Sequence, residues 1–307
     1  MAKILVTGGL GVIGTHLVRF LRLNGHDVWI CDLPHHHDDK YRRCDVGSHR
    51  QVERMLTGIG GIEYVYHLAA EFGRWNGEDY YDTLWQSNVI GTKNILRMQE
   101  RLGFRLIFTS SSEVYGDYEG VMKEDVMDRI EIRQLNDYAI TKWVNENQIL
   151  NSAQMFKTES VRVRLFNTYG EGEYYSPYRS VNCRFVYCAL RRQPYTVYLG
   201  HHRTSSYVTD TVRTMAKIVE RFKPGEVYNI ASSEYHDIRR LSDLTLKAAQ
   251  RDDHLVTYKE GEPFTTKNKK VDISKVVEDF GHSPTVSLED GIARTVAWMR
   301  QVYGIAD

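Results

Sequence analysis

The stretch LNDYAITKWVNENQIL, residues 135–150, carries a phenol and an ammonium at a spacing that suits proton transfer. Its pattern predicts a helix, on which Tyr138 and Lys142 lie four residues apart, one turn from each other on one face. A phenol ordinarily titrates near pH ~10, but a neighbouring ammonium favours its ionised form. Such pairs also arise by chance on amphipathic helices. We predict that the pair takes the proton of an alcohol, provided that the chain also holds an acceptor for the hydride.

A second set of reactive side chains ends an apolar run. RLIF reads as a strand, and TSSSEVYG at 109–116 then presents Ser111, Ser112 and Glu113. Serines often stop a strand by bonding free backbone groups. A carboxylate at the carboxyl end of a strand, however, lies where open α/β sheets bind their ligands. Two interpretations of Glu113 are open at this point: a structural turn, and a group that transfers protons.

The first strand-to-helix turn indicates the hydride acceptor. ILVTGGLGVIGTHLV places Gly8, Gly11 and Gly14 where the lack of a Cβ lets a pyrophosphate reach a helix N-terminus. Asp32 ends the next strand, DVWICD, and its carboxylate would bind an adenosine ribose and repel a 2′-phosphate. The pattern predicts NAD rather than NADP, and a positive nicotinamide ring would further favour an ionised Tyr138. A strand-ending turn is the alternative interpretation of Asp32.

A parallel sheet is needed to position these groups. From residue 3 to about 165, apolar runs alternate with amphipathic stretches: KILVTGG, THLVRFLRLNG, DVWICD, EYVYHLAA, NVIGTKNILRMQER, RLIFTSS and VRVRLFN. This alternation predicts a Rossmann-type, doubly wound α/β domain that binds NAD over residues 1–165. The rhythm changes after residue 166, through NTYGEGEYYSPYRS to the closing helix LEDGIARTVAWMRQVYG. Residues 166–307 are predicted to be a smaller, mainly substrate-binding region, partly interleaved with the first.

The composition argues against several classes of function. Forty basic and forty acidic residues balance without long runs of one sign, so neither nucleic acid nor a membrane surface is an expected partner. The four cysteines form no CxxC pair, which fits a reducing cytoplasm, and we predict a cytoplasmic protein. The run of His35, His36 and His37 before Asp38 and Asp39 lacks a partner pair at i, i+4. We therefore expect a solvated loop there and no metal site.

These motifs together resemble the extended short-chain dehydrogenase/reductase superfamily, specifically its NAD-dependent nucleotide-sugar epimerase/dehydratase group. The resemblance rests on TGGLGVIG, Asp32, DV at 45–46, HLAA at 67–70, SNVIGT at 87–92, SSSEVYG, YAITK, RLFNTYG at 164–170 and RTSSYVTD at 203–210. These run in family order over nearly the whole chain. The resemblance implies a catalytic set of Tyr138, Lys142 and Ser111.

The resemblance also implies binding residues for two ligands. The NAD site would be formed by Gly8, Gly11, Val12, Ile13, Gly14, Asp32, Asp45, Val46, Leu68, Ala69, Ala70, Asn88, Tyr138 and Lys142. A nucleotide sugar would meet Ser111, Ser112, Asn167 and Arg203, the last two at its diphosphate and nucleoside. A homodimer would form through two helices, within 88–103 and 136–150.

In this family the reaction is expected to begin by oxidation of the sugar's C4 hydroxyl. Simple 4-epimerases usually carry a neutral residue at the position of Glu113, whereas 4,6-dehydratases and glucuronate decarboxylases resemble this chain in having glutamate. Glu113 is therefore expected to serve as a further catalytic residue in elimination or decarboxylation. Ser112 stands where some dehydratases have a general acid, and Glu171 replaces a common proline, so the sugar and base stay open. A 4-epimerase, and more remotely a non-catalytic NAD-binding regulator, are the alternatives.

Overall fold

Seven parallel strands form the central sheet of the computed structural model, which describes residues 1–306. Their order is β11-β6-β5-β4-β1-β2-β3. The strands are β1 (Lys3–Thr7), β2 (Asp27–Asp32), β3 (Tyr41–Arg43), β4 (Tyr64–His67), β5 (Arg105–Ser111), β6 (Ser160–Leu165) and β11 (Val227–Ile230). The strand order reverses between β1 and β4, and doubly wound sheets open a ligand crevice at such a point. The predicted Rossmann-type α/β class is confirmed.

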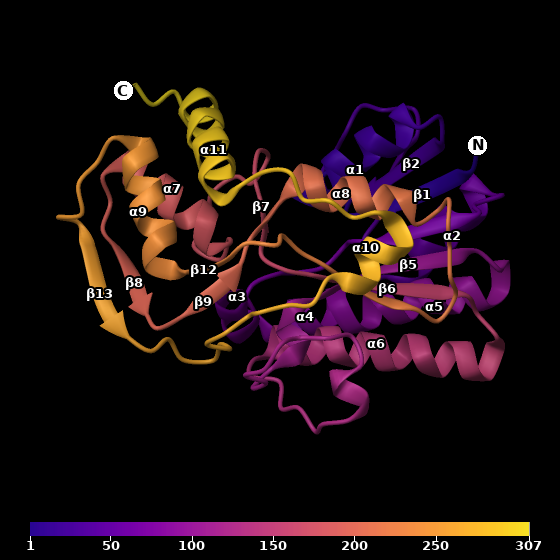
Figure 1. Cartoon of the computed structure of the whole chain (residues 1–307). Helices are drawn as coiled ribbons and strands as arrows, with labels where there is room; N and C mark the ends of the chain where they lie inside the picture. Colours follow the sequence, from indigo (N-terminus) through magenta and orange to yellow (C-terminus); the bar gives the residue numbers. More distant parts are fainter. Residues whose placement is uncertain (307) are drawn as a thin grey trace.

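Helices cover both faces of this sheet (Figure 1). One face carries α1 (Val12–Leu23), α8 (Val208–Lys217) and α10 (Ser274–Phe280), and the other carries α2 (His49–Ile59), α5 (Gly91–Leu102) and α6 (Asp137–Phe156). Successive residues of β1 serve the two cores in turn, because Ile4 and Val6 pack beneath α1 and α8 whereas Leu5 packs beneath α2 and α5. The uninterrupted apolar runs of the sequence follow from this burial on both sides.

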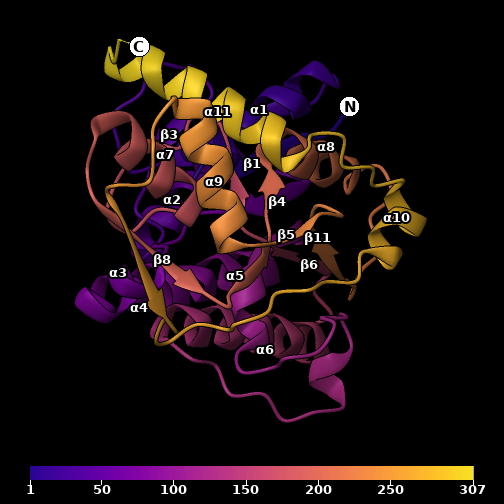
Figure 2. The same cartoon turned by 60° about the vertical axis from the view of Figure 1, so that its left-hand side comes forward.

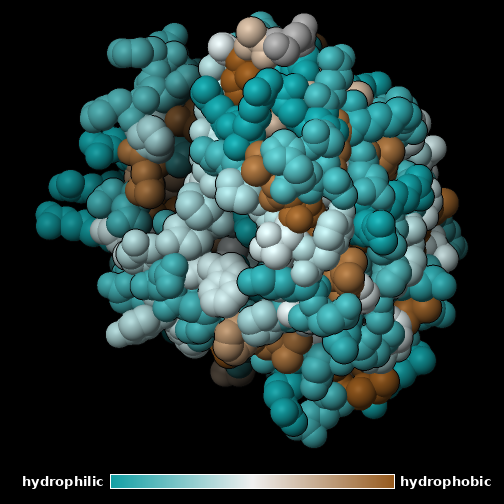
Figure 3. All heavy atoms as spheres, turned by 90° about the vertical axis from the view of Figure 1, so that its left-hand side faces the viewer, coloured by the Kyte–Doolittle hydropathy of each residue, from teal (hydrophilic) through white to brown (hydrophobic). Residues whose placement is uncertain are grey.

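A second, smaller layer lies beyond the carboxyl ends of the strands (Figures 1 and 2). Here α7 (Val181–Arg191), α9 (Ile238–Ala249) and α11 (Leu288–Tyr303) pack on one another, and β8 (Tyr195–Leu199) pairs in parallel with β13 (Val256–Glu260). Two short pairs complete the layer: β7 (Thr168–Tyr169) with β10 (Ser206–Tyr207), and β9 (His202–Thr204) with β12 (Tyr235–Asp237). The face shown in Figure 3 is mostly hydrophilic, with apolar side chains in small separate patches.

Local signals explain where the site-bearing helices begin. Asn136 caps α6, since its side chain accepts a hydrogen bond from Ala139 N at 2.8 Å, and Asp137 adds a negative charge in the first turn. The remaining helices are α3 (Arg74–Asp79), α4 (Tyr81–Trp85), the π-helical turn η1 (Gln86–Ile90), and the 3₁₀ turns η2 (Ser112–Tyr115) and η3 (Val126–Asp128). Among residues 1–306, no helix combines the length and apolar character needed to cross a bilayer.

Candidate active site

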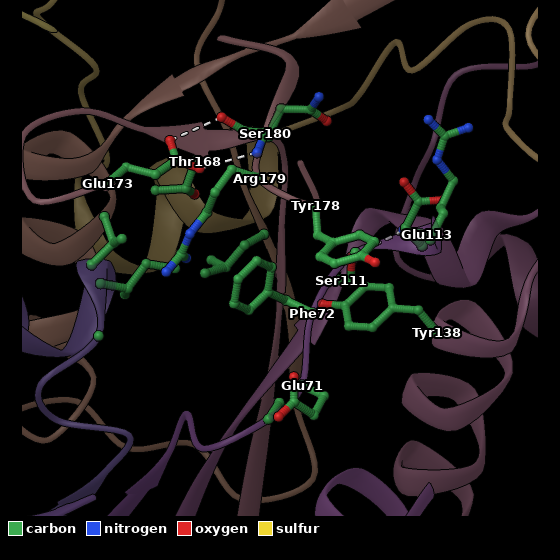
Figure 4. A pocket seen from close by; sticks show the side chains of 18 of the residues that line it. Glu71, Phe72, Ser111, Glu113, Tyr138, Thr168, Glu173, Tyr178, Arg179 and Ser180 are labelled. Atoms are coloured by element: carbon green, nitrogen blue, oxygen red, sulfur yellow. Dashed lines mark hydrogen bonds between the residues drawn. The ribbon is translucent and has the colours of Figure 1, made fainter. Parts of the chain in front are cut away.

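A cavity of about 530 Å³ lies between the carboxyl ends of the strands and the second layer (Figure 4). The predicted site residues that line it are Gly8, Gly11, Val12, Ile13, Gly14, Asp32, Asp45, Val46, Leu68, Ala69, Ala70, Ser111, Ser112, Glu113, Tyr138, Lys142, Asn167 and Arg203. Asn88 is buried and does not line the cavity. Its side chain donates to Glu71 O and Thr141 Oγ1 and accepts from Glu71 N. Asn88 thus supports the wall that the other residues form.

The glycine turn leaves no room for side chains. Gly8 has a φ of +68°, and a Cβ on it would lie 2.7 Å from Ala69 N. A Cβ on Gly14 would lie 2.2 Å from Gly8 O. No side chain caps α1 at Gly11, so the first N–H groups of the helix are open toward the cavity. This cradle fits the pyrophosphate of NAD, because backbone N–H groups and the helix dipole both favour negative charge there.

The carboxylate of Asp32 joins the glycine turn to β2. Its Oδ2 accepts a hydrogen bond from Leu10 N at 2.9 Å, and its Oδ1 accepts one from Leu33 N at 2.8 Å. Each oxygen keeps a second lone pair for a ribose hydroxyl. Asp45 Oδ1 accepts from Gly47 N at 2.8 Å and shapes the loop farther along the cavity. An acid in the place of Asp32 fits NAD and would repel the 2′-phosphate of NADP.

Tyr138 and Lys142 are neighbours on α6, but the ammonium does not bind the phenol. Lys142 Nζ donates to Thr109 O at 2.9 Å and lies 5.8 Å from the centre of the Tyr138 ring. Burial raises the pKa of Tyr138 to about 12, with the charge of Glu113 adding to the rise and a hydrogen bond to Ser111 opposing it. That Lys142 favours the phenolate stays a prediction, because its ammonium is directed to the backbone of β5 and lies near the phenol ring without bonding the hydroxyl. Burial also lowers the pKa of Lys142 to about 8.

Three successive residues at the end of β5 each contact one residue of α6. The pairs are Thr109 with Lys142, Ser110 with Glu146, and Ser111 with Tyr138. Glu146 is completely buried and binds Arg164 through two contacts of 2.9 and 2.8 Å, with Arg162 at 3.4 Å. Ser110 Oγ donates to the same carboxylate at 2.6 Å. This buried network fixes the register between the strand that carries Ser111 and the helix that carries Tyr138.

Glu113 lies among cations that come from distant segments. Lys269 Nζ forms an ion pair with Glu113 Oε1, and these two side chains are 2% and 17% exposed. Although burial acts against ionisation, the charges of Lys269, Arg74 and Arg203 lower the pKa of Glu113 to about 2. Burial lowers the pKa of Lys269 to about 8, against the attraction of Glu113. At neutral pH the cavity wall therefore holds a carboxylate, and behind it lies an ammonium that loses its proton in mildly alkaline solution.

The other two cations of this cluster have partners of their own. Arg74 forms an ion pair with Glu262 at 2.7 Å. Arg203 donates to His202 O at 2.8 Å, to Lys267 O at 3.0 Å and to Thr265 Oγ1 at 3.1 Å. Arg203 lines the cavity as predicted, but most of its hydrogen-bonding capacity is used within the chain.

Sequence reasoning missed several residues of the cavity wall. Glu173, Tyr178, Arg179 and Ser180 come from the loop between β7 and α7. Sequence reasoning also missed Lys269, from the segment before α10, which does not line the cavity but pairs with Glu113 behind its wall. The tyrosine- and glutamate-rich composition of that loop was a signal of an unusual site, but it could not say which side chains face inward. Lys269 has no sequence signal, because only the tertiary fold brings it to Glu113. No group of three His, Cys, Asp or Glu side chains within residues 1–306 is arranged to hold a metal ion.

Comparisons with known proteins agree with this architecture. The model of the NAD dependent epimerase/dehydratase family matches residues 4–231. The UDP-N-acetyl-alpha-D-glucosaminuronate decarboxylase of Bacillus cytotoxicus is 30% identical, over 98% of this chain and 98% of its own. The UDP-glucuronic acid decarboxylase 6 of Arabidopsis thaliana is 30% identical, over 94% of this chain and 86% of its own.

Solved structures share the whole fold. MoeE5, solved in complex with UDP-glucuronic acid and NAD, has a TM-score of 0.87 and 26% identity, covering 98% of this chain and 100% of MoeE5. The UDP-glucose 4-epimerase of Thermotoga maritima, solved with UDP-glucose, has a TM-score of 0.87 and 26% identity, covering 98% of this chain and 99% of its own. With the glycine turn, Asp32 and the Tyr138–Lys142 pair in one cavity, this chain belongs to the NAD-dependent epimerase/dehydratase family.

Proposed function

We propose that this chain decarboxylates a UDP-linked hexuronic acid, with NAD as its cofactor. The two relatives named above are decarboxylases of UDP-hexuronates, and MoeE5 binds UDP-glucuronic acid. The observation that carries the proposal is the ion pair of Glu113, which lines the cavity, with the buried Lys269 behind it.

The ionisation of this pair favours decarboxylation over elimination. A carboxylate with a pKa of about 2 is a weak base toward the C5 proton of a sugar. Elimination of water also needs an acid that protonates the leaving hydroxyl. The residue before Glu113, where that acid would be needed, is Ser112, which is not an acid. Decarboxylation needs neither group, because the electrons of the C5–C6 bond pass to the C4 carbonyl as carbon dioxide leaves. It needs a proton returned to C5, and Lys269, which lies behind the cavity wall with a pKa of about 8, can supply one at neutral pH through its ion-pair partner Glu113, which lines the cavity.

The charge balance of the cluster fits a substrate that carries a carboxylate. Three cations, Arg74, Arg203 and Lys269, stand with two carboxylates, those of Glu113 and Glu262. One positive charge is left uncompensated. A hexuronate supplies the missing negative charge, whereas a neutral hexose does not.

Tyr138 and Ser111 supply the acid–base chemistry at C4. When bound, NAD supplies the hydride acceptor for C4 and later the donor. Tyr138 takes the proton of the C4 hydroxyl and returns it at the end, and the hydrogen bond to Ser111 favours the ionised phenol that this step needs. Lys142, held by Thr109 O, keeps a positive charge beneath the phenol ring.

The direct test is incubation with UDP-glucuronate and with UDP-N-acetylglucosaminuronate, followed by mass analysis of the sugar nucleotide. Loss of carbon dioxide is the expected result, whereas an unchanged mass with an inverted C4 would indicate the predicted alternative, a 4-epimerase. In Glu113→Gln we expect the C4 oxidation to persist, visible as transient absorbance of reduced cofactor, while turnover to the decarboxylated product slows sharply, because the amide cannot pass the proton of Lys269 to C5. Unchanged turnover in that variant would return Glu113 to a structural role.

The homodimer and the division of labour between residues 1–165 and 166–307 stay predictions. Exposed apolar side chains on or just after α5 and α6 support the dimer, since Leu102, Leu150 and Phe156 are 47%, 43% and 52% exposed. Leu150→Lys is expected to yield monomers in light scattering after gel filtration. A parent protein that elutes as a monomer at micromolar concentration would contradict the dimer.

A further inference from the structure

We propose that Arg179 is a diphosphate-binding residue of this cavity, held in place by its stack on Phe72. It lies on the bridge, a name we use for residues 171–179, which crosses the cavity between α1 and α3. Two ligands could bring the diphosphate, the cofactor and the nucleotide sugar, and the second of these rests on the proposed function.

The guanidinium of Arg179 is free to bind a ligand. It lies 4.0 Å from the centre of the Phe72 ring and lines the cavity (Figure 4). Within residues 1–306 it has no hydrogen-bond partner, and its Nε is buried without one. A buried donor without a partner is costly, so such a group in a cavity wall indicates a ligand that bonds to it.

The bridge is anchored at both ends, which gives Arg179 a defined position. At one end, His16 Nε2 of α1 and Glu171 O are 2.9 Å apart. At the other, Tyr178 Oη donates to Asp79 Oδ2 of α3 at 2.9 Å. Gly73, with a φ of +93°, brings the two segments together, because a Cβ there would lie 2.7 Å from Tyr178 O. Arg179, which follows Tyr178, is therefore held at the cavity by the contacts at both ends of the bridge.

Glu173 is the acid whose charge interacts with Arg179, and its carboxylate already has hydrogen-bond partners. Glu173 accepts hydrogen bonds from Ser180 N at 3.1 Å and from Ser180 Oγ at 2.9 Å, at the N-terminus of α7. It interacts with Arg179 through charge alone, since no ion pair joins the two among the described residues. Glu173 thus leaves the donors of Arg179 available.

A diphosphate is the ligand that matches these donors. A planar guanidinium stacked on an aromatic ring makes paired hydrogen bonds to phosphate oxygens, which a lysine cannot reproduce. Arg203, the residue expected at the substrate's diphosphate, spends three hydrogen bonds on the chain itself. No side-chain donor of Arg179 has a hydrogen-bond partner among residues 1–306, and Arg179 lines the same cavity as the glycine turn.

The test measures binding and needs no turnover. In Arg179→Gln we expect a loss of roughly 10- to 100-fold, the effect of losing a charge-assisted hydrogen-bonded pair. One arm follows the NAD that the purified protein retains during dialysis, by acid release and chromatography. The other arm measures UDP affinity of the NAD-loaded protein by calorimetry. Loss in the first arm assigns Arg179 to the cofactor's pyrophosphate, and loss in the second assigns it to the substrate's diphosphate.

Control variants separate this role from a structural one. Arg239→Gln removes an exposed arginine that stacks on Tyr258 outside the cavity, and we expect both arms to stay within about twofold of the parent. Arg179→Lys keeps the charge but removes the paired, planar donors of the guanidinium. We expect it to fold normally and to lose an intermediate amount of binding affinity. The proposal is overturned if Arg179→Gln changes neither arm, or if Arg239→Gln weakens binding as much. Because no arm requires decarboxylation, these results are independent of whether the proposed reaction is correct.

Discussion

Tyr138 and Lys142 stand one turn apart, yet the structure gives them different partners. Ser111 lowers the pKa of the phenol, while the ammonium donates to the backbone of β5. The spacing on the helix could be read from the sequence, but the direction of Lys142 could not, because it depends on where Thr109 O lies at the end of the neighbouring strand. We therefore propose that the chemistry at C4 depends on the phenol and Ser111, with the ammonium as a nearby charge.

Tyr138→Phe tests that assignment. Removing the hydroxyl should lower turnover by roughly 10²- to 10⁴-fold, the usual contribution of a positioned acid–base group. NAD retention should not change, because the glycine turn and Asp32 are untouched. Steady-state kinetics and cofactor content check both expectations. Tyr64→Phe, which removes a phenol that contacts Arg105 away from the cavity, serves as the matched control. Parent-like turnover in Tyr138→Phe would contradict the role of the phenol.

Lys269 allows a prediction about pH. Burial lowers its pKa to about 8, so the protonated form, the proposed source of the C5 proton, is lost as the pH rises through about 8. Activity should fall over that range. An arginine stays protonated, so Lys269→Arg should move this alkaline limb to higher pH while keeping the ion pair with Glu113. Burial also lowers the pKa of Lys142 to about 8, and an unmoved limb in Lys269→Arg would assign the limb to Lys142 instead.

At the scale of elements, the join between β5 and α6 decides whether the catalytic groups meet. Glu146, with Arg164 and Ser110, holds the two elements in register from within the core. The buried arginines of SVRVRL, residues 160–165, look out of place in a strand until this carboxylate is found opposite them. Sequence reasoning located the strand and the helix but not their shared ion pair, since the pairing depends on the twist and packing of the sheet.

Glu146→Ala should destabilise the protein by about 3–5 kcal/mol, because it leaves the charge of Arg164 buried without a partner. Urea unfolding measures the change as a difference in unfolding free energy. Glu159→Ala breaks the ion pair of Glu159 with Arg105, whose side chains are 47% and 46% exposed, and should cost about 0–1 kcal/mol. Equal effects of the two substitutions would mean that the buried network does not join the elements as described.

At the scale of the whole molecule, the parallel sheet and the glycine turn were predictable, and the closure of the cavity was not. Apolar runs report burial on both faces of a sheet, so β1, β2, β4, β5 and β6 could be located from sequence. Every predicted site residue except Asn88 lines the cavity. Arg179, which lines the cavity, and Lys269, which pairs with Glu113 behind the cavity wall, both come from loops, and no periodic pattern reports which loop side chains turn inward. These loops supply the charges that favour one reaction over another within a shared fold.

Product mass from UDP-glucuronate and UDP-N-acetylglucosaminuronate tests the central claim most directly. The ionised Glu113, the protonated Lys269 and the uncompensated positive charge beside them predict a UDP-pentose product and released carbon dioxide from at least one of the two. Loss of water from a neutral UDP-hexose, or C4 inversion of the hexuronate with its carboxylate retained, would contradict this account.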